Sequence, residues 1–334
     1  MELAPGVYQF KLPIPDNPLV PDSTLGEAFA YLVETEDGYV LVDAGWNNQD
    51  TFDSLLTSIA ETGVNPASIR WIVITHYHPD HFGLAQKLRE LSGAKIVMHR
   101  LDLPDNIRKH YLSHTDAASN WMKEWQLSQG MSEPDVTQIP PPKKGIDIFL
   151  PAINVDITLK GGEKLDDGNA SLEVIWTPGH TEGHICLYDK RRKLLFSGDQ
   201  LLPKITPHIS VHPHTHGNPL GDYLNSLDKL DSLDVCLVLP GHEYAFPNFH
   251  SRIKEIKYHH QIRAEETRQA LQEGPQTPYQ VASHLKWNIG PWEKISPFNK
   301  QMAMFEALAH LRHLQQQGEV HTFKVGSTDF YEKD

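Results

Sequence analysis

The 334-residue sequence contains only two cysteines and no apolar run near the roughly 20 residues that a membrane-spanning helix needs. Cys186 and Cys236 each lie in an apolar, strand-like stretch, so we expect two buried, reduced thiols and no disulfide framework. The first residues lack a basic segment followed by an apolar one, which argues against a secretion signal. These absences predict a soluble, cytoplasmic protein.

Positive charge is also scarce, because 30 Lys and Arg stand against 43 Asp and Glu, a formal net charge of −13. Such a surface disfavours tight, nonspecific binding to nucleic acid or to an anionic membrane. Residues 251–334 are nearly balanced, with 11 basic and 10 acidic residues, so the acidity belongs to the first 250 residues. We therefore expect a small-molecule substrate and no membrane partner.

Histidine, by contrast, is abundant, and three histidines stand together with one carboxylate in the segment HYHPDH (76–81). The segment follows the apolar, strand-like run WIVIT (71–75) and precedes a helical pattern. A lone histidine in a loop is most often an ordinary surface residue, but several potential ligands at one strand end need a common partner. His and Asp are ligands typical of zinc and similar metals, whereas calcium sites are built from oxygen alone.

Three more candidate ligands stand just beyond predicted strands: His180 after SLEVIWTPG, Asp199 after KLLFSG and His242 after VCLVLPG. A nearby glycine lets the backbone turn sharply, so that each side chain can face a common site. These ligands are too many for one tetrahedral ion, and the sequence predicts a binuclear site. The predicted ligands are His76, His78, Asp80, His81, His180, Asp199 and His242.

These motifs resemble the metallo-β-lactamase superfamily, whose H-x-H-x-D-H signature is matched in full. The resemblance extends over about residues 5–250 and includes Asp43 in LVDAG, which is expected to orient the H-x-H-x-D-H loop. The resemblance implies one metal ion held by His76, His78 and His180, another held by Asp80, His81 and His242, and Asp199 as the bridge between them.

The resemblance also implies a chemistry. Two zinc ions, with Mn2+ or Fe2+ as substitutes, would share a hydroxide that attacks a small ester or thioester, with Asp80 and Asp199 as the catalytic carboxylates. The commonest zinc β-lactamases have cysteine in place of Asp199, and the flavin-partnered di-iron members have glutamate in place of His78. Antibiotic hydrolysis and redox chemistry are therefore both disfavoured.

The order of strand-like and helical patterns predicts an α/β protein, the αββα sandwich of the metallo-β-lactamase fold, over residues 1–247. A polar insertion at about 101–140, rich in Trp, Tyr and Met, is expected to form a helical lid. Residues 248–334 resemble the winged-helix extension carried by a subset of the superfamily. Their longest helical pattern, 299–317, offers only Lys300 and Arg312 as basic residues, which favours pocket shaping or a homodimer over nucleic-acid binding.

Two other functions stay open at this point. The same metal pair would serve an endoribonuclease or another phosphodiesterase, although the acidic composition weighs against it. A DNA-binding regulator with a vestigial hydrolase domain is opposed by the complete ligand set. Of the remaining residues, the histidines of the loop 204–217 suit an exposed loop about as well as substrate contact, His184 is expected beside a ligand, and Tyr244 is expected to be packed.

Overall fold

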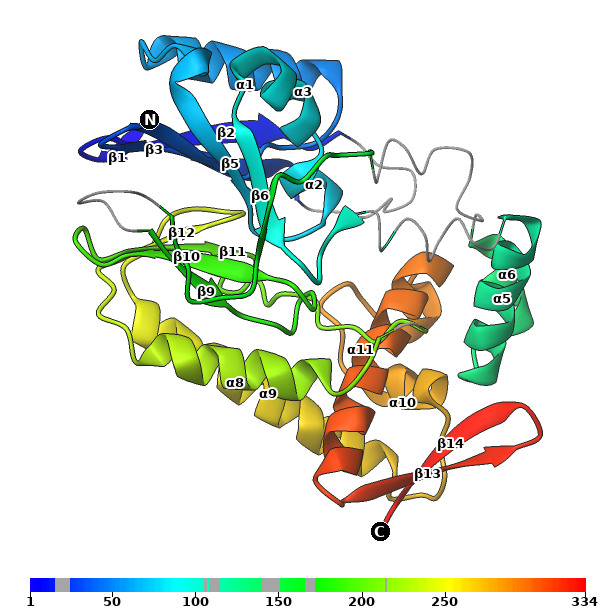
Figure 1. Cartoon of the computed structure of the whole chain (residues 1–334). Coiled ribbons are helices and arrows are strands. Elements are labelled where there is room, and N and C mark those ends of the chain that lie inside the picture. Colours follow the sequence, from blue (N-terminus) through cyan, green and yellow to red (C-terminus); the bar gives the residue numbers. More distant parts are fainter. Residues whose placement is uncertain (16–24, 105–106, 108–114, 140–150, 166–171, 214) are drawn as a thin grey trace. The chain divides into compact units, whose positions relative to one another are not determined.

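A computed structural model shows the fold (Figure 1). Two compact units make up the chain. The first contains residues 1–110, 144–207 and 226–252, and the second contains residues 111–143, 208–225 and 253–334. The structure describes residues 1–15, 25–104, 107, 115–139, 151–165, 172–213 and 215–334.

The larger sheet of the first unit has seven strands in the order β1 to β7. Neighbours are antiparallel from β1 to β4 and parallel from β4 to β7. The carboxyl ends of β4 to β7 therefore lie at one edge of this sheet. The bounds are β1 Glu2–Ala4, β2 Val7–Pro13, β3 Glu27–Thr35, β4 Gly38–Val42, β5 Ile69–Ile74, β6 Lys95–His99 and β7 Ile157–Leu159.

The smaller sheet has five strands in the order β12-β11-β10-β9-β8. Only β11 and β12 run parallel among these pairs, so the carboxyl ends of these two strands lie side by side. The bounds are β8 Lys164–Leu165, β9 Leu172–Trp176, β10 Ile185–Asp189, β11 Leu194–Gly198 and β12 Leu237–Pro240.

Helices cover the outer faces of both sheets. In Figure 1, α1 and α3 lie on the outer side of the seven-stranded sheet. The Nζ atom of Lys229 donates to the carbonyl of Trp176 in β9, which holds the part of α8 from Ser226 onward against the other sheet. These layers confirm the predicted αββα sandwich. The helix bounds are α1 Gln49–Glu61, η1 Pro66–Ser68, α2 Pro79–Phe82, α3 Ala85–Ser92 and α8 Pro219–Asp231.

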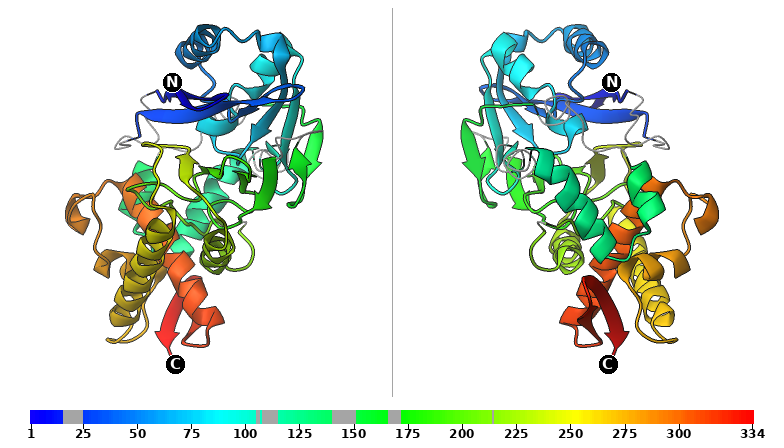
Figure 2. Two further views of the ribbon diagram at one scale, coloured as in Figure 1. Left: turned by 90° about the vertical axis from the view of Figure 1, so that its left-hand side faces the viewer. Right: turned by 90° about the vertical axis from the view of Figure 1, so that its right-hand side faces the viewer.

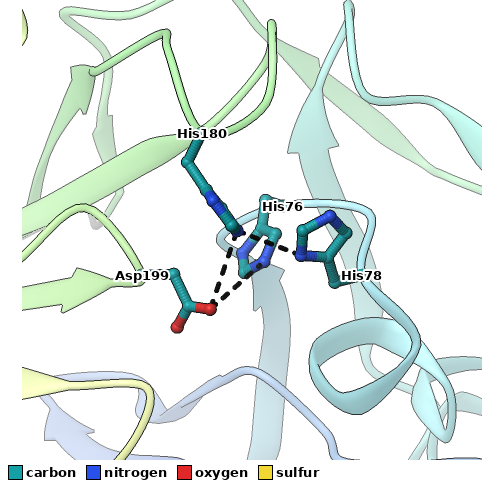
Figure 3. Close-up of side chains that lie close together, drawn as sticks. All are labelled: His76, His78, His180 and Asp199. Atoms are coloured by element: carbon teal, nitrogen blue, oxygen red, sulfur yellow. Dashed lines mark hydrogen bonds and ion pairs between the residues drawn. The ribbon is translucent and has the colours of Figure 1, made fainter. Parts of the chain in front are cut away.

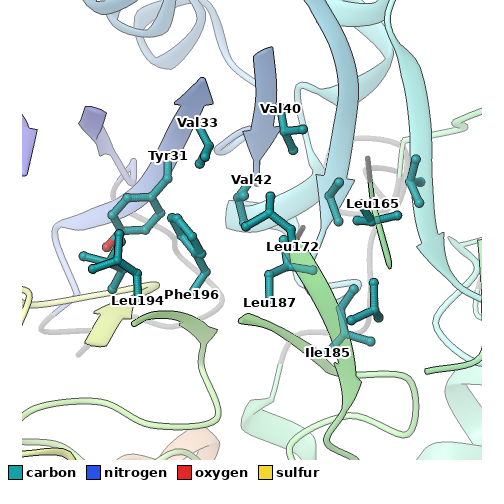
Figure 4. Packing of buried hydrophobic residues seen from close by; sticks show 14 of the residues in the cluster. Tyr31, Val33, Val40, Val42, Leu165, Leu172, Ile185, Leu187, Leu194 and Phe196 are labelled. Atoms are coloured by element: carbon teal, nitrogen blue, oxygen red, sulfur yellow. The ribbon is translucent and has the colours of Figure 1, made fainter. Parts of the chain in front are cut away.

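An apolar core fills the space between the two sheets (Figure 4). Phe196 of β11 meets Tyr31 of β3 edge to face, with ring centroids 5.4 Å apart. Because both rings are buried, removing the Phe196 side chain would cost about 3–5 kcal/mol of stability. The Tyr31 hydroxyl donates to the carbonyl of Pro240 at 2.6 Å. The core thereby fixes the end of β12, two residues before the predicted ligand His242.

The second unit is mainly helical, and its apolar residues pack within it. Leu308 and Leu311 of α11 are buried, as is Val281 of α10. Figure 2 shows the hairpin β13–β14 directly after α11, next to the C-terminus. The predicted order of helix, helix, helix and hairpin is present, and the winged-helix likeness stays a prediction. The bounds are α5 Thr115–Ser128, α6 Glu133–Gln138, α9 Phe249–Ala270, α10 Pro278–His284, η2 Trp292–Lys294, α11 Pro297–Gln316, β13 Val320–Val325 and β14 Thr328–Lys333.

The described part of the predicted insertion contains helices α5 and α6, as expected, and these helices group with the C-terminal residues. The Lys300 ammonium in α11 lies 3.3 Å from the Asp135 carboxylate in α6, and Gln129 donates to Asp329 at 2.7 Å. The substrate role of this insertion stays a prediction. The sequence IPPPKKG (139–145) at the end of this insertion predicts a linker or turn, and all of it except Ile139 lies outside the described residues.

One prediction about the cysteines is wrong. Both thiols are free, and Cys186 is buried in β10 as expected, but Cys236 is exposed. The apolar run around Cys236 was expected to be a strand from residue 235, whereas β12 begins at Leu237. Cys236 therefore lies before the strand, where its side chain meets solvent. None of the helices in the described ranges is long and apolar enough to cross a membrane.

Candidate metal centre

The predicted ligands come from loops that follow strands of the first unit. The segment 76–81 follows β5, His180 follows β9, Asp199 follows β11 and His242 follows β12. Pro79 occupies the first turn of α2, where its missing N–H costs nothing, and the helix places Asp80 and His81 one after the other. The two sheets thus present their ligands at neighbouring strand ends.

Four of the predicted ligands form a first group, namely His76, His78, His180 and Asp199, with one donor atom from each lying within 4.8 Å of the others. The Nε2 atom of His180 lies 3.0 Å from the Nδ1 atom of His78 (Figure 3). Asp199 Oδ2 lies 3.7 Å from His180 Nε2 and 3.9 Å from His76 Nε2. The nitrogen and oxygen donors therefore point toward one another.

Asp80, His81 and His242 form a second group of the same kind. The Nε2 atom of His242 lies 3.4 Å from both Asp80 Oδ2 and His81 Nε2. Asp199 also borders this group, because its Oδ2 lies 3.4 Å from His242 Nε2 and its Oδ1 lies 3.5 Å from His81 Nε2. One carboxylate thus stands between two sets of donors, which is the position that a bridging ligand requires.

The donor atoms fit a pair of metal ions. His76 Nε2 and Asp199 Oδ1 are buried and have no hydrogen-bond partner among the described residues. Buried polar atoms without a partner are costly, and they are rare unless an ion or water satisfies them. Imidazole nitrogens together with carboxylate oxygens are a donor set that suits zinc.

Hydrogen bonds orient the rings of the second group. His81 Nδ1 donates to Asp43 Oδ2 at 2.8 Å, and His242 Nδ1 donates to the carbonyl of Glu27 at 2.8 Å. Each ring then turns its Nε2 atom toward the other donors, as in histidines that bind metal. Asp43 also accepts from the backbone N–H of Thr75 at 2.8 Å, so it holds the start of the 76–81 loop as expected.

Electrostatics differ between the two groups when no metal is bound. Burial and neighbouring imidazoles hold the pKa of His76 and His78 well below the ordinary range. Burial also lowers the pKa of His81 and His242, but the nearby carboxylates, Asp199 first, outweigh it and raise these values to about 10 and about 9. The second group therefore holds protons that a metal ion must displace, so metal affinity falls as the pH falls.

Two glycines allow the loops to approach closely. Gly198 has a φ of +47°, and a Cβ on it would lie 2.8 Å from His184 Nε2. A Cβ on Gly241 would collide with the Asp199 carboxylate. His184 lies beside the predicted ligand Asp199, because its Nε2 atom accepts from the backbone N–H of that residue at 3.1 Å.

Asp102 is a buried residue at this site that sequence reasoning missed. Its Oδ1 accepts from the backbone N–H of Gly183 at 2.6 Å, and its Oδ2 accepts from the Thr181 hydroxyl and the Tyr77 N–H. Burial raises the pKa of Asp102 to about 7, although these three hydrogen bonds oppose the rise. Asp102 thus ties the loop of His76 and His78 to that of His180. Its only sequence signal is a position three residues after β6.

The histidine-rich loop belongs largely to the second unit and supplies no described ligand. His208 Nε2 donates to the carbonyl of Met302 at 3.0 Å, and the His212 ring packs on Phe305 with centroids 4.9 Å apart. Neither histidine lies in either donor group. His214 lies outside the described residues. Tyr244, expected to be packed, is instead 45% exposed.

The sequence profile of the metallo-beta-lactamase superfamily matches residues 23–242 of the chain. The chain belongs to this superfamily. Its predicted ligands all fall within the matched range, and the assignment confirms the family and the fold that the motifs indicated.

Two curated proteins and one solved structure are similar to this chain over most of its length. A probable metallo-hydrolase of Bacillus subtilis is 26% identical over 92% of this chain and 93% of its own. A metallo-beta-lactamase family protein of known structure from Thermus thermophilus is 29% identical, with a TM-score of 0.79 and full coverage of both chains. An acyl-coenzyme A thioesterase of Gallus gallus is 28% identical over 64% of this chain and 71% of its own. The chain is thus a metallo-hydrolase of this fold.

Proposed function

We propose that this chain is a binuclear zinc hydrolase that cleaves small esters or thioesters. The observation that best supports this proposal is the position of Asp199, whose carboxylate lies within 4 Å of histidines from both donor groups. His76, His78 and His180 would hold one ion, and Asp80, His81 and His242 would hold the other. The chemistry supplied by such a metal pair is the activation of water at neutral pH and the polarisation of the attacked carbonyl.

The protein's own part in this proposal is to keep the donors aligned. Asp43 and the Glu27 carbonyl fix the His81 and His242 rings, and His184 fixes the backbone of Asp199. The partly exposed carboxylate of Asp80 is the candidate to orient the attacking water. Preorganised donors of this kind need no rearrangement during the reaction, which is the main source of rate enhancement in such sites.

The proposed substrate class rests on a likeness and on charge. The Gallus gallus relative is an acyl-coenzyme A thioesterase, which makes thioesters the first class to test. The net charge of −13 weighs against long polyanions such as RNA, because nucleic-acid binding depends on many cationic contacts. Phosphodiester cleavage is the competing function, because the same donor set serves it.

A substrate panel tests the proposal. Zinc-loaded protein is incubated with acetyl-coenzyme A, a short lactone, a neutral ester and single-stranded RNA, and the same protein stripped by a chelator serves as the control. We expect thioester or ester hydrolysis that disappears on stripping and returns with zinc. Metal-dependent cleavage of RNA alone would favour the phosphodiesterase, and inactivity towards the whole panel would contradict the proposal.

The variant Asp80→Asn sharpens this test. It keeps the size of the side chain but removes its charge, so we expect a large loss of turnover with little change in unfolding temperature. Exposed Asp234 lies before β12 and makes a surface ion pair with Lys193, so Asp234→Asn is a matched control. Equal activity of the two variants would argue against a role for Asp80.

A further inference from the structure

The loop 202–205, which follows the predicted ligand Asp199, is fixed by hydrogen bonds from two charged side chains. The guanidinium of Arg252, itself buried, donates to the carbonyls of Leu202, Lys204 and Ile205 at 2.7, 2.8 and 2.8 Å. On the other side, Glu243 Oε2 accepts from the N–H groups of Lys204 and Ile205 at 2.9 and 3.2 Å. Two charged side chains thus fix both the donors and the acceptors of this backbone.

The residue that supplies the carboxylate is itself strained. Glu243 has a φ of +70°, a left-handed conformation that residues other than glycine seldom adopt. It directly follows the ligand His242, and the loop that it holds begins soon after the ligand Asp199. Strain of this kind persists where the surrounding structure enforces it, and it gathers at functional sites. The position of the loop therefore depends on two segments, the one that contains Asp199 and the one that contains His242 and Glu243.

The fixed backbone presents exposed side chains. Lys204 is exposed, and its ammonium lies 5.4 Å from the centre of the Tyr244 ring. Ile205 is 38% exposed and Tyr244 is 45% exposed. We call Lys204, Ile205 and Tyr244 the rim.

We propose that the rim binds the phosphorylated leaving group of a thioester, with the Lys204 ammonium on a phosphate and the Tyr244 ring against a flat or apolar part of the same group. This inference rests on the proposed function and names its substrate class. An ammonium is a standard partner of phosphate, and an exposed aromatic ring stacks on a nucleotide base. In a chain of net charge −13, a single cation on a fixed loop that follows the predicted ligand Asp199 favours a compact anionic group over a polyanion.

Two thioesters that differ only in the leaving group test this inference. Acetyl-coenzyme A carries phosphates, and S-acetyl-N-acetylcysteamine has the same scissile bond without them. With Lys204→Met, we expect KM for acetyl-coenzyme A to rise about tenfold, the loss of one charge-assisted hydrogen bond, with kcat nearly unchanged. Lys204→Glu should raise KM further. Neither variant should change KM for the truncated thioester.

Lys95→Glu is the matched control, because exposed Lys95 starts β6, at the end opposite the strand ends that carry the ligands. It should leave both KM values unchanged. The inference is overturned if Lys204→Glu affects both thioesters equally or neither of them.

A binding measurement separates failure of the inference from failure of the proposed function. Calorimetry of free coenzyme A with zinc-loaded protein requires no turnover, and we expect binding that weakens at least tenfold in Lys204→Glu. Should the native protein be inactive towards the whole panel, the proposed function fails while this measurement still tests the rim. Equal binding by both proteins, or Lys204-dependent binding of an RNA oligonucleotide but not of coenzyme A, would overturn the rim's assignment.

Discussion

Buried histidines gather in both units of this chain, and their surroundings differ. In the first unit they follow strand ends and face the carboxylates of Asp80 and Asp199. In the second unit His260 of α9 faces His310 of α11, with Nδ1 and Nε2 3.5 Å apart. Arg263 supplies positive charge near this pair, and its guanidinium stacks on the Trp287 ring. Histidine density alone therefore does not define a metal site, because the second pair lacks carboxylate donors in ligand position among the described residues.

We call the two donor groups of the first unit the first cluster, and the pair His260 and His310 the second cluster. Nearby carboxylates also distinguish the protonation of these clusters. Carboxylates raise the pKa of His81 and His242 against the effect of burial. Burial lowers the pKa of His260 to about 3, helped by the charges of neighbouring His259 and Arg263, and it holds the pKa of His310 well below the ordinary range. The carboxylates thus keep His81 and His242 protonated when no metal is bound, whereas burial keeps His260 and His310 neutral.

Removing the shared carboxylate of Asp199 should give the largest difference in activity between variants of the first and the second cluster. Asp199→Ala deletes a donor of both groups. Residues that only support a metal ligand typically cost about 10–100-fold in activity when they are changed. We therefore expect the loss of a direct donor to lower kcat/KM at least about 100-fold. His260→Gln should leave kcat/KM unchanged. Steady-state kinetics, with circular dichroism to show retained folding, measure both. Near-normal turnover of Asp199→Ala would refute its bridging role.

A smaller effect is expected where the loops of the first cluster are tied together. Asp102→Asn replaces one acceptor oxygen with an amide that faces N–H or O–H donors, so the loops of His76 and His180 should separate. We expect zinc affinity to fall about 10–100-fold, measured by competition with a chromogenic chelator.

Asp189→Asn provides the control for Asp102. Asp189 is equally buried but accepts from Arg192 in a turn at the far end of β10. It should cost stability without changing zinc affinity. Equal zinc affinities of the two variants would show that Asp102 only stabilises the fold.

A fall in pH should lower the stability of the fold through the second cluster. Because the folded-state pKa of His260, about 3, lies below the unfolded value near 6.5, protons favour the unfolded chain below pH 6.5. The stability present above pH 6.5 is therefore lost as the pH falls toward 3. Between pH 6.5 and 5 the loss from His260 should be about 2 kcal/mol. Urea unfolding at both pH values should show a correspondingly smaller loss in the double variant His260→Gln, His310→Gln, and identical losses would contradict this account.

The sequence predicted the residues of both donor groups because their signals are local. A strand, a glycine and a polar residue within a few positions identify His180, Asp199 and His242, and the H-x-H-x-D-H segment is contiguous. Asp102 was missed because Tyr77, Thr181 and Gly183, its partners, are 25 to 81 residues away and leave no periodic pattern. The exposure of Tyr244 and Cys236 was mispredicted because it depends on where loops pass and strands begin, which hydropathy does not encode.

The metal content of each cluster tests the central claim most directly. Three proteins are reconstituted with zinc, dialysed and analysed for metal per chain. They are the native protein, a first double variant (His76→Ala with His180→Ala) and a second double variant (His260→Gln with His310→Gln). We predict close to two ions in the native protein, no more than one in the first variant and two in the second. A native protein that retains one ion or none, or a second variant that loses an ion while staying folded, would contradict the account.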